Sequence, residues 1–158
     1  AAYIANAWII RTRMIKVDVQ GELPPSITES QIHELAQVIL VNEAPQADYE
    51  ISLRCTDSPE MRRINRQYRG VDSTTDVLSF VGDSLPLGER ELRICDIIID
   101  TNQVFLQKGQ NTYKEEFWQV LIHSLLHLAG YDHTRTWDRK KMEDAEDNYR
   151  MQIPKGLA

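Results

Sequence analysis

Hydrophobic and polar residues alternate along four stretches of the chain in the way that predicts β-strands. Within the first stretch, Ile15, Val17 and Val19 alternate with polar residues, which is typical of a half-buried strand. The isoleucine run at 97–99 in the last stretch indicates a strand that is buried on both faces. The predicted strands are residues 14–20, 49–55, 75–81 and 92–99.

Other stretches repeat their apolar residues at helical spacing and carry the residues that begin or end helices. Thr112 and Glu115 form a capping box, while Gly70 and Gly130 are suited to end helices because glycine readily adopts the left-handed conformation. The predicted helices are residues 28–42, 58–68, 101–108, 112–129 and 137–151. Residues 82–88 are predicted to form a loop. The order of elements predicts an α+β fold, with about four strands in a single sheet packed with about five helices.

The length of 158 residues and the lack of an internal repeat or linker predict one domain, which we place at residues 14–158. An apolar fraction of 42% and a charged fraction of 27% are typical of a soluble globular protein. The use of only two cysteines, Cys55 and Cys95, fits the reducing cytoplasm better than a secreted disulfide scaffold. We therefore expect a cytoplasmic protein.

The first residues of the chain show no targeting signal. Residues 1–13 place an apolar run before arginines, which is the reverse of the order in a signal peptide. The chain also lacks the roughly 18 consecutive apolar residues of a membrane-spanning helix, so we expect no membrane partner. We interpret residues 1–13 as a non-native or disordered extension, and the sequence leaves open whether they belong to the native protein.

Three of the four histidines lie between residues 123 and 133, and this cluster is the main chemical signal of the chain. His123 and His127 are four residues apart on a predicted helix, so they share one face and suit a single metal ion. Gly130 ends the helix and turns the chain, which lets His133 approach the same ion. Three imidazoles leave one tetrahedral position open, as in catalytic zinc sites. We therefore predict one zinc ion per chain.

Two other interpretations of the cluster remain open. In the first interpretation, the histidines of the cluster are ordinary core and loop residues. We interpret His33 in this way. The metal is structural in the second, with Cys55 or Cys95 as a fourth ligand. The histidine spacing is also similar to the zinc signature of metzincin proteases. However, Ser124 occupies the position of the catalytic glutamate, and Met142 lies within a helical pattern rather than in a methionine turn.

Arginines of the second predicted helix form a basic stripe in a chain whose net charge is −6. Arg62, Arg66 and Arg69 share one face, and Arg63 lies next to them. Such a stripe is often a solvated face with surface ion pairs. Beside a metal, however, the planar guanidinium suits phosphate oxygens, which favours a phosphodiester substrate over a peptide. The negative net charge argues against nucleic-acid binding over the whole protein surface.

Several motifs together resemble the YbeY family of bacterial metallo-endoribonucleases that process rRNA. They are I-N-R-Q-Y-R-G at 64–70, T-D-V-L-S-F at 75–80, C-D-I-I-I at 95–99 and H-S-L-L-H-L-A-G-Y-D-H at 123–133. The resemblance extends from about Met14 to Tyr149. Two positions depart from the family pattern, since Val81 replaces a usual proline and Cys95 a usual glycine.

The resemblance implies a mixed sheet, a zinc ion on the three motif histidines and a conserved arginine that corresponds to Arg69. It also implies cleavage of single-stranded RNA, maturation of the 3′ end of 16S rRNA and quality control of ribosomes. The implied partners are 16S rRNA and the small ribosomal subunit, together with ribosomal proteins or an assembly GTPase. A noncatalytic ribosome-binding factor with a structural metal fits the same resemblance.

These considerations lead to the following expected roles. His123 and Arg69 are catalytic, with Arg69 stabilising charge that develops on phosphate oxygens. Asp132 is a candidate acceptor that orients an imidazole, or else a loop aspartate in contact with water. Thr75 and Asp76 are expected to shape the substrate groove or only to begin a strand. The expected RNA-binding residues are Arg62, Arg66 and Arg69.

Overall fold

One four-stranded sheet lies at the centre of the structure, a computed structural model that describes residues 14–132 and 136–153. The strands lie in the order β1-β2-β4-β3. β1 and β4 both run parallel to β2, whereas β3 runs antiparallel to β4, so the sheet is mixed. The strands are β1 (Ile15–Gln20), β2 (Ala47–Thr56), β3 (Val77–Leu87) and β4 (Arg90–Asp100).

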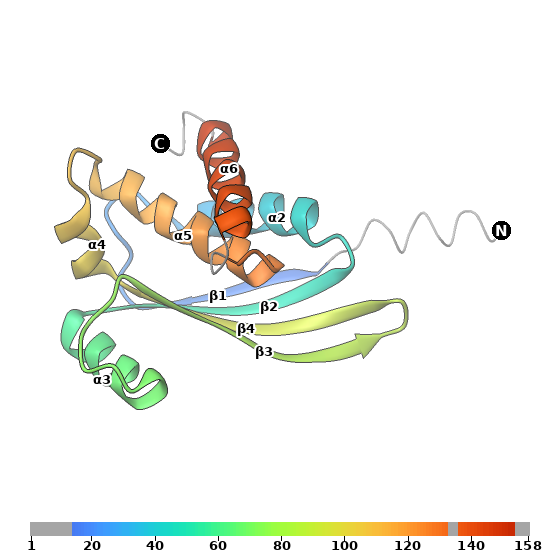
Figure 1. Ribbon diagram of the computed structural model, residues 1–158, viewed down its shortest axis with the longest axis horizontal. Helices are drawn as coiled ribbons and strands as arrows, with labels where there is room; N and C mark the ends of the chain where they lie inside the picture. Colours follow the sequence, from blue (N-terminus) through green and yellow to red (C-terminus); the bar gives the residue numbers. More distant parts are fainter. Residues whose placement is uncertain (1–13, 133–135, 154–158) are drawn as a thin grey trace.

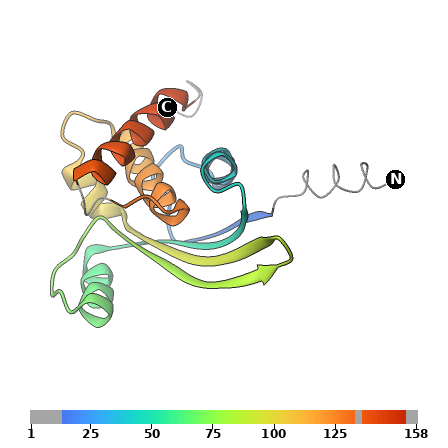
Figure 2. The same cartoon turned by 45° about the vertical axis from the view of Figure 1, so that its right-hand side comes forward.

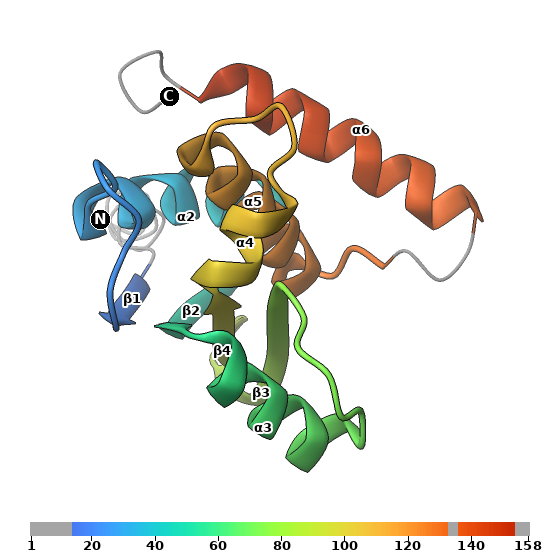
Figure 3. The same cartoon turned by 90° about the vertical axis from the view of Figure 1, so that its left-hand side faces the viewer.

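Helices cover the two faces of the sheet unequally. Figures 1 and 2 show α2, α4, α5 and α6 on one face, with α3 on the other. Figure 3 shows the same separation from the side, with a long connection leading from α3 to β3. The helices are α2 (Glu29–Glu43), α3 (Ser58–Arg69), α4 (Thr101–Gln107), α5 (Tyr113–Ala129) and α6 (Thr136–Gln152). Within the described ranges, these four strands and five helices confirm the predicted α+β fold.

The helix ends follow signals that are local in the sequence. Thr112 caps α5 by accepting a hydrogen bond from the Glu115 amide at 3.1 Å, and the Glu115 carboxylate accepts one from the Thr112 amide at 2.9 Å. Gly70 ends α3 with φ +69°, and Gly130 ends α5 with φ +114°, both in the left-handed region. The predicted caps are therefore confirmed. None of the helices in the described ranges combines the length and apolar character needed to cross a membrane.

The prediction of a loop at residues 82–88 is wrong, because β3 continues through most of this segment and forms a hairpin with β4. The pairing shifts register between Val81 and Ser84, as a β-bulge does. Gly82 permits this close approach, since a Cβ at its position would lie 2.4 Å from the carbonyl oxygen of Ile94. The bulge interrupts the period-two pattern by which the sequence would have revealed a continuous strand.

The main core lies between the sheet and the helices that cover its larger face. The buried residues of α5 are Phe117, Trp118, Val120, Leu121, Ile122, Ser124, Leu125, Leu126 and Leu128. A second cluster, under α3, consists of Met61, Ile64 and Leu78. Ile97 and Ile99 of β4 belong to the main core, whereas Ile98 packs against the second cluster. This end of β4 is therefore covered on both faces, as its isoleucine run predicts.

A buried polar contact fixes the last turn of α5 to the sheet. Tyr49 of β2 donates its hydroxyl hydrogen to the carbonyl oxygen of Leu128 at 3.0 Å. Arg93 of β4 in turn donates to the Tyr49 hydroxyl oxygen at 2.7 Å. Burial raises the pKa of Tyr49 above its ordinary value, and the nearby Arg93 partly offsets that effect. The hydroxyl therefore stays protonated and holds the helix end next to His127.

Replacement of Tyr49 by phenylalanine tests this contact. Tyr49→Phe leaves a buried carbonyl with a poorer donor, so we expect the free energy of unfolding in urea to fall by about 1–2 kcal/mol. The matched control is Tyr68→Phe, because the Tyr68 side chain is 65% exposed and its hydroxyl can bond to water. We expect the control to change stability by less than about 0.5 kcal/mol. Equal effects of the two substitutions would contradict the role of the Tyr49 hydroxyl.

Candidate metal centre and RNA-binding surface

His123 and His127 lie one turn apart on α5, at the side of the helix that faces α6 and the residues after Gly130. The α5 core residues hold the helix on the sheet, while both histidine side chains stay partly exposed. The spacing therefore places the two predicted ligands on one face, as expected. The third predicted ligand, His133, lies outside the described residues, so its place in the site stays a prediction.

Glu146 of α6 holds the ring of His123. The Nδ1 atom of His123 lies 2.6 Å from Oε1 of Glu146, and the carboxylate accepts this hydrogen bond. The bond raises the pKa of His123 above its ordinary value, burial opposes it, and the charges of Glu146 and Asp76 add to the rise. Glu146 was not among the site residues predicted from the sequence. The helical spacing could have indicated it weakly, because Glu146 lies on the inward side of α6 with Met142, Ala145 and Tyr149.

The backbone after Gly130 holds the second ring. His127 donates from Nδ1 to the carbonyl oxygen of Tyr131 at 3.1 Å. The Tyr131 hydroxyl donates to Oε2 of Glu43 at 2.7 Å, and the Tyr149 hydroxyl donates to Oε1 of Glu43 at 2.5 Å. Burial and the bond to Glu43 raise the pKa of Tyr131 to about 12, so the hydroxyl remains a donor at neutral pH. The end of α2 thus fixes the turn that carries the carbonyl.

The two imidazoles fit a zinc ion in their chemistry. In a neutral imidazole that donates from Nδ1, the lone pair resides on Nε2, which is then the ligand atom. Histidines that bind metals commonly donate their other ring N–H to a carboxylate or a carbonyl, which are the acceptors found here. His123 and His127 would therefore supply two zinc ligands. Residues 14–132 and 136–153 contain no complete group of three ligands.

The two cysteines are poor candidates for a further ligand. Cys55 and Cys95 are free thiols within the apolar core of the sheet. Burial raises the pKa of Cys55 to about 12 and that of Cys95 to about 11. Zinc binds the thiolate form, which such burial disfavours. These surroundings weigh against the structural site with a cysteine ligand.

Asp76 lies close enough to His123 to affect its pKa, and it comes from the chain just before β3. Gln107 of α4 donates from Nε2 to Asp76 Oδ2 at 3.0 Å and to Glu116 Oε1 at 3.1 Å. Thr75 donates to Asp76 Oδ1 at 3.4 Å. The structure therefore brings the predicted pair Thr75 and Asp76 to the neighbourhood of His123. Gln107 was not predicted as a site residue, because a single glutamine in a short helix forms no recognisable pattern in the sequence.

The connection from α3 to β3 is anchored at two points. Asn65 donates from Nδ2 to the Ser73 carbonyl at 2.9 Å. The Thr74 hydroxyl donates to Oδ2 of Asp100 at 2.6 Å, and Asp100 is fully buried as the N-cap of α4. These bonds fix the segment that leads from Arg69 to Asp76.

The arginines of α3 differ in their partners. Arg62 forms two hydrogen bonds with Asp72, at 2.9 and 3.0 Å, and Arg66 lies 3.6 Å from the same carboxylate. Arg63 pairs with Glu60 at 2.7 Å. The side chain of Arg69 makes no hydrogen bond or ion pair within the described part of the chain. Most arginines of the stripe therefore form ion pairs on a solvated face. The guanidinium group of Arg69 remains available to bind an anion.

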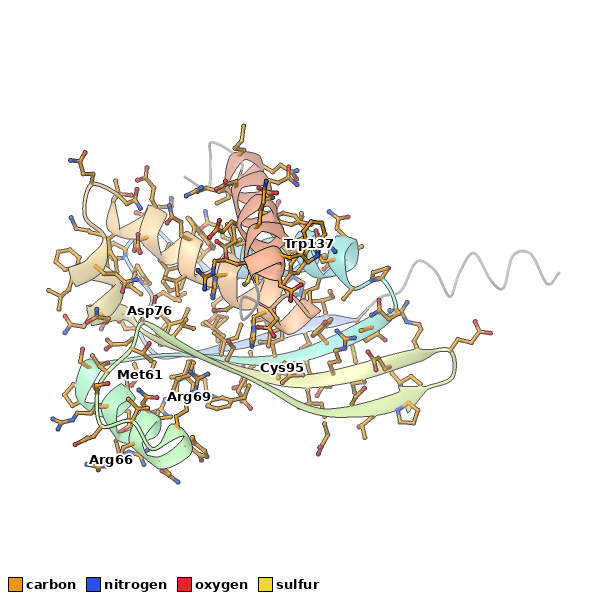
Figure 4. The ribbon with its side chains drawn as sticks, viewed as in Figure 1. Met61, Arg66, Arg69, Asp76, Cys95 and Trp137 are labelled. Carbon is orange, nitrogen blue, oxygen red and sulfur yellow. The ribbon has the colours of Figure 1, made fainter. Side chains whose placement is uncertain are left out.

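The labelled side chains in Figure 4 show how these arginines lie. Arg69 lies on the side of α3 toward the sheet, below Asp76 in this view, whereas the Arg66 side chain points away from the sheet. The side chains of these two residues therefore diverge, although their spacing predicted a shared face. Arg69 therefore lies near the edge strand β3.

Three further sequence predictions concern residues around the histidine motif. Ser124, which stands where metzincin proteases have their catalytic glutamate, is fully buried and donates its hydroxyl hydrogen to the Val120 carbonyl at 2.9 Å. Met142 is buried within α6, which confirms its helical setting. Asp132 is exposed and lines a pocket of about 340 Å³ with Tyr131 and Lys141. Its role toward an imidazole stays a prediction.

Comparisons with known proteins agree with this geometry. The family model of endoribonuclease YbeY matches residues 16–153. Endoribonuclease YbeY of Petrotoga mobilis is 37% identical over 144 residues, which cover 89% of this chain and 96% of that relative. Endoribonuclease YbeY of Clostridioides difficile is 32% identical over 145 residues, covering 89% and 92%.

A solved structure shows the same fold. The solution structure of a Thermotoga maritima protein aligns with this structure with a TM-score of 0.59 and a sequence identity of 28%. The alignment covers 89% of each of the two chains. The family match extends over nearly the whole described region, including both α5 histidines, Glu146 and Arg69. The chain belongs to the YbeY endoribonuclease family.

Proposed function

We propose that this chain is a zinc-dependent endoribonuclease specific for single-stranded RNA, acting in the cytoplasm on the 3′ end of 16S rRNA and in ribosome quality control. The observation that carries the zinc site is the pair of α5 imidazoles, each held at Nδ1 by an oxygen acceptor. The rRNA substrate and the ribosome as partner rest on membership of the family.

His123, His127 and His133 would hold one zinc ion per chain. Zinc at this place would supply Lewis-acid activation of water and of the scissile phosphate. The chain's own residues set the geometry, because Glu146 and the Tyr131 carbonyl fix the orientation of two rings. Preorganised rings lose little freedom when a ligand binds, which favours affinity and a defined coordination geometry.

Arg69 would bind a phosphate oxygen and stabilise the negative charge that develops there during cleavage. The ion pairs of Arg62 and Arg66 with Asp72 reduce what these two residues offer a phosphate. Arg69 has no such carboxylate within the described ranges. Thr75 and Asp76 would shape the groove beside His123, where Gln107 holds the Asp76 carboxylate.

A phosphodiester substrate fits this site better than a peptide. Peptide hydrolysis by enzymes with two histidines at this spacing relies on a glutamate next to the first ligand, and here Ser124 is buried against the Val120 carbonyl. The net charge of −6 limits nonspecific contact with RNA. We therefore propose that the small ribosomal subunit, with ribosomal proteins or an assembly GTPase, positions the substrate.

Replacement of His123 by alanine is the first test of the metal site. We expect His123→Ala to lower zinc content below one equivalent and to reduce cleavage of a short single-stranded RNA to background. His33→Ala is the matched control, since His33 bonds through Nε2 to the Ile15 carbonyl at 2.8 Å and lies on α2. We expect this control to retain metal and cleavage.

Assays of RNA cleavage, ribosome binding and peptide cleavage distinguish the alternative functions. Full zinc occupancy with equal cleavage by wild type and His123→Ala, purified in parallel, would indicate a contaminating nuclease and contradict the proposal. Ribosome binding without RNA turnover would support a noncatalytic factor. Chelator-sensitive cleavage of peptides instead of RNA would support a protease.

Weakening the contact between Glu146 and His123 is expected to lower the affinity for zinc. Glu146→Gln removes the charge that orients His123, so we expect zinc affinity or kcat to fall about 10- to 100-fold. Glu143→Gln is the control, because Glu143 is exposed on the same helix one turn away. Competition with a chromophoric chelator measures the affinity. Indistinguishable zinc affinities and kcat values for the two variants would show that Glu146 does not support the site.

Replacement of Arg69 is expected to impair catalysis without loss of the bound metal. We expect Arg69→Ala to lower kcat/KM for RNA about 100- to 1000-fold while zinc content stays unchanged. Arg63→Ala provides the comparison, since Arg63 is exposed on the same helix but is paired with Glu60. Unchanged cleavage by Arg69→Ala with full zinc content would refute a phosphate contact through this residue.

A further inference from the structure

Tyr68 presents an aromatic ring at the surface beside Arg69. The side chain lies in the last turn of α3 and is 65% exposed. Its ring centroid lies 5.8 Å from that of Phe80, with the two planes inclined at 59°. Contact with Phe80 on one side leaves much of the Tyr68 ring open to solvent.

The support beneath this ring is well fixed. Phe80 belongs to β3 and packs against the second core cluster, which includes Met61 and Ile64 of α3. Gly70 ends α3 directly after Arg69, and Asn65 holds the following segment through the Ser73 carbonyl. Tyr68 therefore stands on a rigid part of the fold and would lose little freedom when a ligand contacts it.

The charge around the ring is also distinctive. Arg63 and Arg66 of the same helix face carboxylates at 2.7 and 3.6 Å. Arg69, the next residue after Tyr68, has no carboxylate partner in the described part of the chain. An exposed aromatic ring and a cation available for phosphate thus occupy consecutive positions in the last turn of α3. Proteins that bind single-stranded nucleic acid combine these two features.

We propose that Tyr68 stacks against an unpaired nucleobase of the RNA strand whose phosphate contacts Arg69. This inference rests on the proposed function and adds a binding site for the base. All four bases have an apolar face, so the site tolerates any sequence. In a duplex, each base face is covered by its neighbours and the ring cannot reach it. Tyr68 therefore contributes to the preference for single strands.

The test measures binding and cleavage separately with wild type and three variants. Tyr68→Leu keeps an apolar contact with Phe80 but removes the aromatic face, and Tyr68→Phe keeps that face. Met151→Ala is the control, since Met151 is 86% exposed in the last turn of α6 on the opposite side of the sheet. Fluorescence anisotropy with chelator present measures affinity for a labelled RNA, and kinetics with zinc give kcat and KM. Thermal unfolding of each variant checks the fold.

We expect Tyr68→Leu to bind single-stranded RNA about tenfold more weakly, with KM raised and kcat nearly unchanged. Tyr68→Phe and Met151→Ala should match wild type. The decisive comparison uses RNAs with one abasic position each. At one position, removal of the base should weaken binding by wild type but have no further effect on Tyr68→Leu.

The outcomes distinguish this site from the proposed function. Equal affinity of wild type and Tyr68→Leu for every RNA would overturn the stacking site, whatever the cleavage results. A defect of Tyr68→Leu that is the same on abasic and intact RNA would also overturn it, because the ring would then act only through the fold. Base-dependent binding through Tyr68 without zinc-dependent cleavage would support the stacking site while refuting the nuclease.

Discussion

The packing of α5 against the mixed sheet is the contact on which the rest of this structure depends. One side of α5 buries a continuous row of large apolar residues, so the hydrophobic effect fixes the rotation of the helix about its axis. That rotation leaves His123 and His127 at the boundary of the core, where they are partly exposed. Tyr49 and Arg93 add a polar contact at the helix end, which fixes its position along the sheet as well.

Polar contacts around the histidines come from elements that lie far apart in the sequence. Glu146 reaches His123 from α6, and Glu43 at the end of α2 accepts hydrogen bonds from Tyr131 and Tyr149. Because Tyr131 also offers its carbonyl to His127, the turn after α5 is held from two directions. Such a network keeps the rings oriented before any ligand arrives, which is the physical requirement for a selective metal site.

The distribution of charge singles out one residue of the proposed RNA-binding surface. Carboxylates compensate most of the arginines of α3, so the helix as a whole is not a strong cation. Arg69 differs because it lies on the flank of the helix toward the sheet, while the Asp72 carboxylate lies with Arg62 and Arg66. The proposed contact with RNA is therefore local, since it rests on Arg69 and on the exposed ring of Tyr68 one position earlier in α3.

The sequence by itself determined the elements and the main chemical signal. Caps, glycines and apolar periodicity act over a few residues, so they predicted the helices, most strand positions and the shared face of His123 and His127. The hairpin through residues 82–87 escaped prediction because a bulge interrupts its alternation. Only the tertiary structure decided that Glu146, among many similar acidic residues of α6, faces His123. It also decided that the Asp72 carboxylate pairs with Arg62 and Arg66, whereas Arg69 pairs with no carboxylate among residues 14–132 and 136–153. These pairings depend on how helices rotate and pack against distant strands, and that information is not contained in any local pattern of residues.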